Sequence, residues 1–246
     1  MSKRLTRAQL DQLSKFTTPT ICNAIEMFRI RRRNEGFMTP EVVCRFPDIG
    51  PMIGYAVTAT HRAREEAQPS SSVDMNAYYE YILSQSAPRL LVSQDLDDPP
   101  VGALFGEVNA TIHKALGCVG HITNGGVRDL DECHRIGFQY FSKYVLVSHA
   151  YVHLESFGQP IRIGGIMVRP GDLIHADQHG ICLIPHTIAL ELAAACRTME
   201  ALERPLIKLA RSPSLTPAKL TATRATMRKK FEEASKRFAQ AATETQ

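Results

Sequence analysis

Two spacings of apolar residues recur along this chain, and they predict where helices and strands lie. Residues 5–28 carry apolar side chains three and four positions apart, which is the spacing of a helix that buries one face. Thr18, Pro19 and Thr20 interrupt this stretch, so we expect two helices, the second beginning near Thr18 or Thr20. Residues 53–60 form an apolar run that is typical of a strand.

The middle of the chain alternates between the two patterns. We expect helices over 76–84, 108–116 and 130–136. We expect strands over 89–93, 118–123 and 140–147, with further strands at 161–168, 173–174 and 181–184. Turn residues at 169–172 and at His179 and Gly180 separate the last of these. The alternation predicts an α/β fold in which strand ends and helix starts meet along one edge.

Helical spacing returns after the strands. Residues 186–202 are expected to form a helix, Pro205 to break or kink the chain at that point, and residues 212–217 to form a linker. A last helix over 218–242 is amphipathic, and we expect it to pack on protein, in this chain or a neighbouring subunit, rather than lie on a membrane. We therefore divide the chain into a domain of residues 1–204 and a basic helical extension of residues 205–246.

Composition and charge narrow the class of protein. Hydrophobic residues make up 44% of the chain and charged residues 22%, as in globular proteins. No apolar run approaches the about 18 residues of a membrane helix, and no secretory signal is visible. The six cysteines are scattered, which predicts free thiols in the cytoplasm rather than structural zinc. The net charge of +4 comes from the basic C-terminal tail, and a basic tail can attract nucleic acid or an anionic membrane. We interpret this tail instead as a helix that packs on protein, so we expect neither a membrane nor a nucleic-acid partner.

The segment Thr123–Asp129 offers the clearest chemistry. Gly125 and Gly126 would allow a sharp turn and a close approach to a ligand. Arg128 presents a rigid fork of donors for a carboxylate or an enolate oxygen, and Asp129 is a hard oxygen donor suited to Mg²⁺ or Mn²⁺. The alternative is structural, with Asp129 as a helix N-cap and Arg128 as a surface ion-pair partner.

A second segment begins at Gly106, immediately before a predicted helix. Backbone N–H groups at a helix start favour anions, so those of Gly106, Glu107, Val108 and Asn109 could hold a carboxylate. Further along, His175, Asp177 and His179 would share a face if extended and could chelate a metal, but the neighbouring turn residues favour a turn. The chain has no G-x-S-x-G, P-loop or G-x-G-x-x-G pattern, which argues against the corresponding enzyme classes.

These residues together resemble the RraA-like family. The resemblance rests on Gly106 and Glu107, twenty intervening residues, Arg128 and Asp129, and then on a series of later turn residues: Gly164, Gly165, Pro170, Gly171, Asp172, Asp177, Gly180 and Pro185. The family includes aldolases that act on 4-hydroxy-4-methyl-2-oxoglutarate and 4-carboxy-4-hydroxy-2-oxoadipate, and the regulator of ribonuclease E activity A. The resemblance covers roughly residues 15–200.

The resemblance implies a layered α/β sandwich of the swivelling-domain type, here with an added C-terminal helix, assembled as a homotrimer or hexamer with sites between subunits. It implies a lyase that depends on Mg²⁺ or Mn²⁺, releases pyruvate from a 4-hydroxy-2-keto diacid and also decarboxylates oxaloacetate. Asp129 would hold the metal and Arg128 would contact the keto and enolate oxygen. Glu107 would orient metal-bound water or assist proton transfer, and backbone N–H groups of residues 106–109 would bind the carboxylate of the 2-keto acid.

Two departures from the family pattern accompany this expectation. Glu107 stands where the aldolases have an aspartate. The aldolases also use an acidic residue of a neighbouring subunit, for which the candidates are Glu191, Glu200 and Glu203. Two other functions stay open from the sequence: a non-catalytic, protein-binding regulator of the ribonuclease E inhibitor type, and another metal-assisted lyase of a keto or hydroxy acid.

Overall fold

The computed structural model describes residues 4–68 and 73–244, in helices and strands that follow much of the expected order. The helices are α1 (Arg7–Leu13), α2 (Thr18–Glu26), α3 (Met75–Ser84), α4 (Glu107–Ala115), α5 (Leu130–Arg135), α6 (Ala189–Ala210) and α7 (Pro217–Glu244), with short 3₁₀ turns at Pro47–Ile49 and His186–Ile188. The strands are β1 (Val43–Cys44), β2 (Met52–Arg62), β3 (Arg89–Asp95), β4 (Ala103–Phe105), β5 (Cys118–Val127), β6 (Gln139–Val145), β7 (His153–Phe157), β8 (Ile161–Ile163), β9 (Ile166–Val168), β10 (Leu173–Asp177) and β11 (Gly180–Ile184).

Contacts group these elements into two compact units. The sheet unit comprises Gly36–Leu183, and the helical unit combines the chain up to Glu35 with the chain from Ile184 onward. The boundary expected at residue 204 lies inside α6, which runs unbroken through Pro205. The C-terminal extension therefore belongs to the same unit as the N-terminal helices.

The sheet unit is built on one large sheet of the described residues, in the order β1-β6-β5-β3-β2-β10-β11, with β4 beside β5 and β7 beside β2. The central strands β2, β3, β5 and β6 run parallel to one another. Because parallel strands end at the same edge of a sheet, the residues at the ends of β3 and β5 are brought close together. This edge carries the residues on which the candidate site depends.

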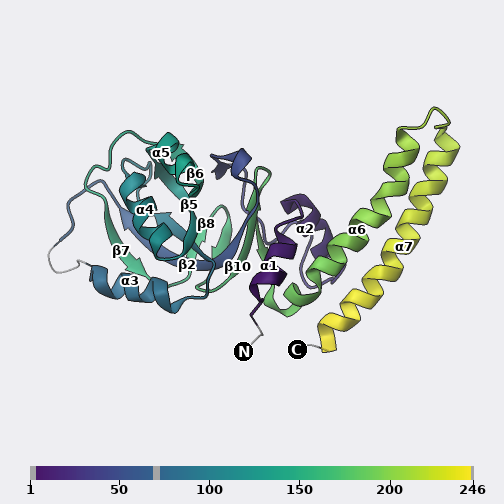
Figure 1. Ribbon diagram of the computed structural model, residues 1–246, viewed down its shortest axis with the longest axis horizontal. Coiled ribbons are helices and arrows are strands. Elements are labelled where there is room, and N and C mark those ends of the chain that lie inside the picture. Colours follow the sequence, from purple (N-terminus) through teal and green to yellow (C-terminus); the bar gives the residue numbers. More distant parts are fainter. Residues whose placement is uncertain (1–3, 69–72, 245–246) are drawn as a thin grey trace. The chain divides into compact units, whose positions relative to one another are not determined.

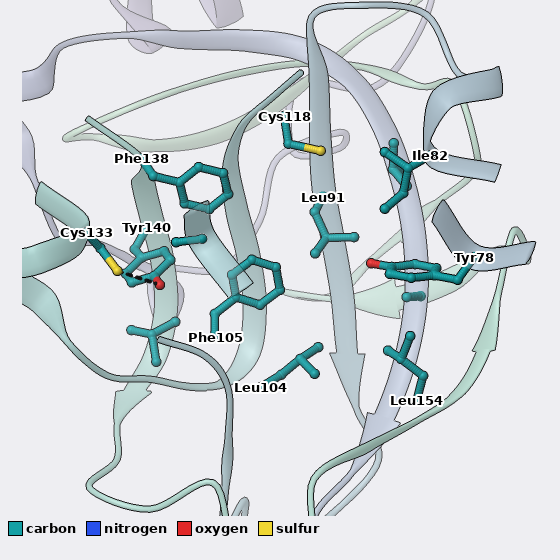
Figure 2. Close-up of a cluster of buried hydrophobic side chains, with 14 of the residues drawn as sticks. Tyr78, Ile82, Leu91, Leu104, Phe105, Cys118, Cys133, Phe138, Tyr140 and Leu154 are labelled. Carbon is teal, nitrogen blue, oxygen red and sulfur yellow. Dashed lines mark hydrogen bonds between the residues drawn. The ribbon is translucent and has the colours of Figure 1, made fainter. Parts of the chain in front are cut away.

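Both faces of the central strands are buried, which explains why their sequences are nearly continuous apolar runs. On one face, Val57 and Leu91 belong to a core with α3, α4 and α5 (Figure 2). On the other face, Ala56 and Leu90 belong to a core that includes the β8–β9 hairpin. Helices, sheet and hairpin thus form the expected layered α/β sandwich, and the expected C-terminal helix is present as α7 (Figure 1).

Four details differ from the sequence-based expectation. Strand β5 continues to Val127 instead of ending at residue 123. Residues 161–168 are two short strands, because Gly164 and Gly165 adopt positive φ angles of 54° and 78° and reverse the chain. The short strands β1, β4 and β7 give too weak a periodic pattern to be predicted. Pro205 does not break α6, so the helix reaches Ala210.

The helical unit is organised around α6, which contacts α1, α2 and α7. Helix α2 begins at Thr18 as expected, and the side chain of Thr17 accepts the N–H of Thr20 as its N-cap. The rings of Phe28 and Phe238 lie 5.2 Å apart and join the N-terminal helices to α7. None of the helices in the described part of the chain is long and apolar enough to cross a membrane.

Candidate active site

Two strand-to-helix corners lie side by side at the edge of the sheet. Strand β4 pairs with the end of β5, with Ala103 opposite Gly126 and Phe105 opposite Val127. The N–H of Arg128 then donates to the carbonyl of Phe105 at 2.9 Å. The start of α4 therefore lies against the start of α5. This pairing brings together Gly106 and Glu107 with Arg128 and Asp129, the residues that the sequence singled out in two separate segments.

Asp129 is held in a specific orientation by its backbone and by α4. Its φ angle of 54° lies in the left-handed region, where residues other than glycine are uncommon. Its carboxylate oxygen Oδ2 accepts the backbone N–H of Glu107 at 2.9 Å, and the side chain makes no cap bond to α5. Asp129 thus occupies the N-cap position of α5, as the structural alternative expected, but its side chain does not cap that helix. It places a negative charge at the N-terminus of α4, where the helix dipole stabilises it.

Arg128 lies beside that carboxylate but leaves a donor unused. Its Nε is 3.8 Å from Oδ2 of Asp129, which is an ion-pair distance but too long for a hydrogen bond. The Nε atom is buried, and no acceptor in the described chain bonds to it. Since a buried donor without a partner is costly, the arrangement leaves Arg128 ready to bind an oxygen that the chain itself does not provide.

Gly106 is required by space rather than by backbone conformation. A Cβ atom at this position would lie 2.3 Å from Oδ2 of Asp129 and 2.9 Å from Nε of Arg128. The φ angle of Gly106 is −135°, which any residue can adopt. The glycine therefore lets the Arg128 and Asp129 side chains lie directly against the first turn of α4.

The other residues expected at the start of α4 divide into two groups. The N–H of Glu107 is occupied by Asp129, whereas the N–H groups of Val108 and Asn109 belong to a first turn that has no intrahelical acceptors. The Glu107 side chain is exposed at this corner. The Asn109 side chain donates to the carbonyl of Leu104 at 2.6 Å, so it supports β4. The capture of a carboxylate by these N–H groups stays a prediction.

Tyr140 is a buried residue that contacts the start of α4 at Gly106, and the sequence analysis did not identify it. It comes from β6, and its hydroxyl lies 3.5 Å from the carbonyl of Gly106 and 2.9 Å from the Cys133 sulfur (Figure 2). Burial raises the pKa of the Tyr140 hydroxyl and raises the pKa of the Cys133 thiol to about 11. Both groups are therefore neutral near pH 7, which makes them supporting groups and not nucleophiles.

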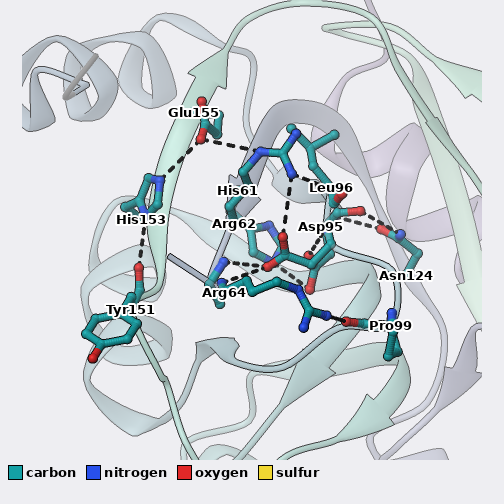
Figure 3. A network of polar contacts seen from close by, with 12 residues as sticks. His61, Arg62, Arg64, Asp95, Leu96, Pro99, Asn124, Tyr151, His153 and Glu155 are labelled. Carbon is teal, nitrogen blue, oxygen red and sulfur yellow. Dashed lines mark hydrogen bonds and ion pairs between the residues drawn. The ribbon is translucent and has the colours of Figure 1, made fainter. Parts of the chain in front are cut away.

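Asn124 and Asp95 fix the strand that leads into the site (Figure 3). The Asn124 side chain accepts the N–H of Asp95 at 2.8 Å and donates to its carbonyl at 2.9 Å, just beyond the last β3–β5 register pair, Ser93 with Thr123. A Cβ atom on Gly125 would lie 2.5 Å from Oδ2 of Asp95. Contrary to expectation, Gly125 makes no sharp turn: it lies within β5 and permits close packing.

A fully buried pair of polar side chains lies next to the two hydrogen bonds between Asn124 and the backbone of Asp95, which we call the clamp. His61 Nε2 is 3.4 Å from Oδ2 of Asp95, and neither side chain is exposed to solvent (Figure 3). His121 is also fully buried and accepts or donates a 2.7 Å hydrogen bond with Ser93. Burial, together with the nearby His61, lowers the pKa of His121 well below its ordinary value. These side chains form a buried polar layer beside β5.

The candidate metal ligands His175, Asp177 and His179 do not all lie in the expected turn: His179 does, whereas His175 and Asp177 belong to strand β10. Asp177 accepts the N–H of His179 at 2.8 Å, and Asp172 accepts the N–H of Arg169 at 2.8 Å. His175 and Asp177 lie buried on β10. Among the described residues, no group of three or more His, Cys, Asp or Glu side chains is arranged to hold a metal ion.

Comparison with known proteins identifies the family. The family model "RraA-like: Aldolase/RraA" matches residues 18–183, and the chain belongs to this family. A protein of Halalkalibacterium halodurans named "Putative 4-hydroxy-4-methyl-2-oxoglutarate aldolase" is 26% identical over 102 residues, which cover 41% of this chain and 49% of that protein. The match thus spans about half the length of this relative.

Solved structures confirm the fold. An uncharacterized protein of Pseudomonas syringae pv. tomato superposes with a TM-score of 0.70 at 22% identity, covering 92% of this chain and 97% of that one. The protein RraAS2 of Streptomyces coelicolor, described as an unusual member of the RNase ES inhibitor RraA family, superposes with a TM-score of 0.62 at 20% identity, covering 82% and 97%. At these identities the likeness establishes the architecture alone.

Proposed function

We propose that this protein is a carbon–carbon lyase that depends on Mg²⁺ or Mn²⁺ and cleaves a 4-hydroxy-2-keto diacid to pyruvate and a second keto acid. The observation that carries the proposal is the arrangement of Arg128 and Asp129 against the first turn of α4, with one buried donor of Arg128 unused. Membership of a family that contains aldolases supports the same reaction class.

The donor set at Asp129 fits a hard divalent cation. The carboxylate is 37% exposed, and its contacts with Glu107 and Arg128 engage only its Oδ2 atom. A single carboxylate with water and substrate oxygens is the usual environment of Mg²⁺, whereas zinc prefers several nitrogen or sulfur ligands. When bound, the cation supplies positive charge that stabilises a developing enolate.

The reaction requires the C3–C4 bond of the substrate to break. The C4 hydroxyl loses its proton and becomes a carbonyl, the bonding electrons move to C3, and negative charge develops on the C2 oxygen. In our proposal the Arg128 guanidinium donates a hydrogen bond to that oxygen, and this hydrogen bond becomes stronger as negative charge develops on the oxygen. The first turn of α4 binds the carboxylate at C1, and Glu107 moves the proton between the C4 hydroxyl and solvent. A proton from solvent then adds to C3 of the enolate and gives pyruvate.

A neighbouring copy of the chain is expected to complete the site, in a homotrimer or hexamer. Exposed apolar side chains surround the corner: Val108 is 72% exposed, Val145 is 50% exposed and Val147 is 95% exposed. Val145 pairs with Val127, the residue before Arg128. Exposed apolar groups next to an open site are typical of a surface that another subunit covers. The three candidate acidic residues, Glu191, Glu200 and Glu203, all lie on α6.

The test is release of pyruvate from 4-hydroxy-4-methyl-2-oxoglutarate and, separately, from oxaloacetate, with Mg²⁺ or Mn²⁺ present. We expect activity that EDTA removes and that falls at least about 100-fold in Asp129→Ala and Arg128→Ala. Asp131→Ala is the matched control, because Asp131 is an exposed carboxylate two residues away on α5. Pyruvate release from oxaloacetate alone would support an enolate-stabilising site but exclude 4-hydroxy-4-methyl-2-oxoglutarate as the substrate. No turnover of either compound by folded protein would reject the lyase and favour a protein-binding regulator.

A further inference from the structure

A groove runs between α6 and α7, on elements that carry neither of the two strand-to-helix corners. The two helices are antiparallel neighbours within the helical unit (Figure 1). The groove has a volume of about 700 Å³, within the range of small-molecule sites. Its walls carry many small side chains, among them Ala194, Ala201 and Thr226, so the helices touch without filling the space between them. No side chain between residues 200 and 234 is buried.

The charges around this groove are all positive. Arg197, Lys230 and Arg237 line it, and no aspartate or glutamate does. Within the described chain, none of these three cations forms an ion pair with a carboxylate, whereas Arg33 pairs with Glu26 in the same unit. Arg237 lies over the ring of Phe238 at 4.8 Å. Three unpaired cations around one hollow are expected to attract an anion.

The groove is polar at one end and apolar at the other. Because the chain reverses between Ala210 and Pro217, residues far from this turn on both helices share one end of the groove. That end holds the three cations. The end near the turn is lined by the apolar side chains of Leu202, Pro205 and Met227, together with the hydroxyl-bearing Thr223 and Thr226. From Arg197 to Pro205 the helix rises about 12 Å, so the apolar part could accommodate an extended aliphatic chain of moderate length.

We propose that this groove binds a single amphiphilic anion, an unbranched alkyl carboxylate, with its head at Arg197, Lys230 and Arg237 and its tail along Leu202, Pro205 and Met227. A second copy of the same hairpin is a poorer occupant. The helical unit carries 19 lysines and arginines against nine acidic residues, so two hairpins placed with their grooves facing each other would repel each other. A helical hairpin with a cationic end and an apolar end matches instead a ligand that combines one charge with one apolar tail.

The test measures binding of radiolabelled decanoate to the full-length protein by equilibrium dialysis, below the concentration at which decanoate forms micelles. We expect saturable binding of one molecule per chain, and binding of decanol at least tenfold weaker. Lys230→Gln should weaken decanoate binding at least tenfold. Lys229→Gln should change it less than twofold, because Lys229 is an exposed cation on the same helix that does not line the groove.

A second variant tests the apolar end without altering charge. Ala201→Leu fills the groove on an exposed position of α6 and preserves helix propensity, so the protein should fold and bind decanoate at least fivefold more weakly. The proposal would be overturned if decanoate showed no saturable binding to the wild-type protein, or if the two lysine variants had equal effects. It would also be overturned if the protein bound vesicles that contain an anionic lipid but did not bind free decanoate. These results leave the lyase proposal untouched, because the dialysis measures no catalysis.

Discussion

Substitution of Gly106 by alanine tests the geometry of the corner most sharply. The added Cβ would lie 2.3 Å from Oδ2 of Asp129, whereas ordinary contacts begin at 3.4 Å, so the two atoms must separate by about 1.1 Å. It would also crowd Nε of Arg128, at 2.9 Å. The carboxylate would then lose its hydrogen bond from the N–H of Glu107 or move together with the start of α4.

The expected cost falls on activity more than on stability. Loss of a hydrogen bond to a charged group costs about 1.5–3 kcal/mol, and a displacement of about 1 Å in a catalytic group can lower the rate by about 100-fold. The φ angle of −135° suits alanine, so no backbone strain is added and the lower entropy of the unfolded chain gives back about 0.4–1 kcal/mol. We predict a folded protein whose kcat for pyruvate release is about 100-fold lower.

The assay compares steady-state pyruvate release and thermal unfolding for the wild type, Gly106→Ala and Thr111→Ala. Thr111 is an exposed residue on the outer part of α4, so its substitution controls for a general effect on that helix. The Thr111 variant should retain wild-type kcat. If Gly106→Ala were folded and as active as the wild type, the contact between the start of α4 and Asp129 would not matter for the reaction.

Three further predictions concern the support of the site. Burial lowers the pKa of His113 to about 4, so the folded state favours its neutral form, and the free energy of unfolding should fall by roughly 3 kcal/mol as the pH drops from 6.5 to 4. His113→Gln should flatten this pH dependence, measured by urea titrations at several pH values, although the variant also loses the 3.0 Å hydrogen bond to Tyr78. Asn124→Ala removes both hydrogen bonds to the backbone of Asp95 and should lower the free energy of unfolding by about 2–4 kcal/mol in urea; a change below about 0.5 kcal/mol would show that the clamp contributes little. Gly125→Ala places a Cβ 2.5 Å from Oδ2 of Asp95 and should cost about 1–3 kcal/mol by thermal unfolding, and an unchanged melting temperature would contradict such close packing.

The sequence predicted the central strands and most helices because they carry long, regular patterns. Strand β2 and helix α3 were placed to within two residues at each end. Short elements were missed, since three residues such as β4 give no period to detect. Pro205 was expected to break or kink the chain. The break does not occur, because packing of α6 against α7 outweighs the local preference.

The candidate site was found as residue types but not as an arrangement. Glu107 and Asp129 were named from the sequence, but their contact depends on β4 pairing with β5, a long-range event that no local pattern reveals. The two glycines before Arg128 were interpreted as a turn, although Gly125 and Gly126 lie in a strand where neighbouring side chains occupy the space of a Cβ. Tyr140 gave no signal beyond its place in an apolar strand.

The central claim is that Arg128 and Asp129 stabilise the enolate of a 2-keto acid, and it can be tested without knowing the full substrate. Pyruvate itself is incubated with the protein and Mg²⁺ or Mn²⁺ in D₂O, and its methyl protons are followed by NMR, since an enolate exchanges them with solvent. We predict rapid exchange that stops with EDTA and in Asp129→Ala, and continues in Asp131→Ala. Absence of exchange with folded wild-type protein, or equal exchange in Asp129→Ala, would contradict the account.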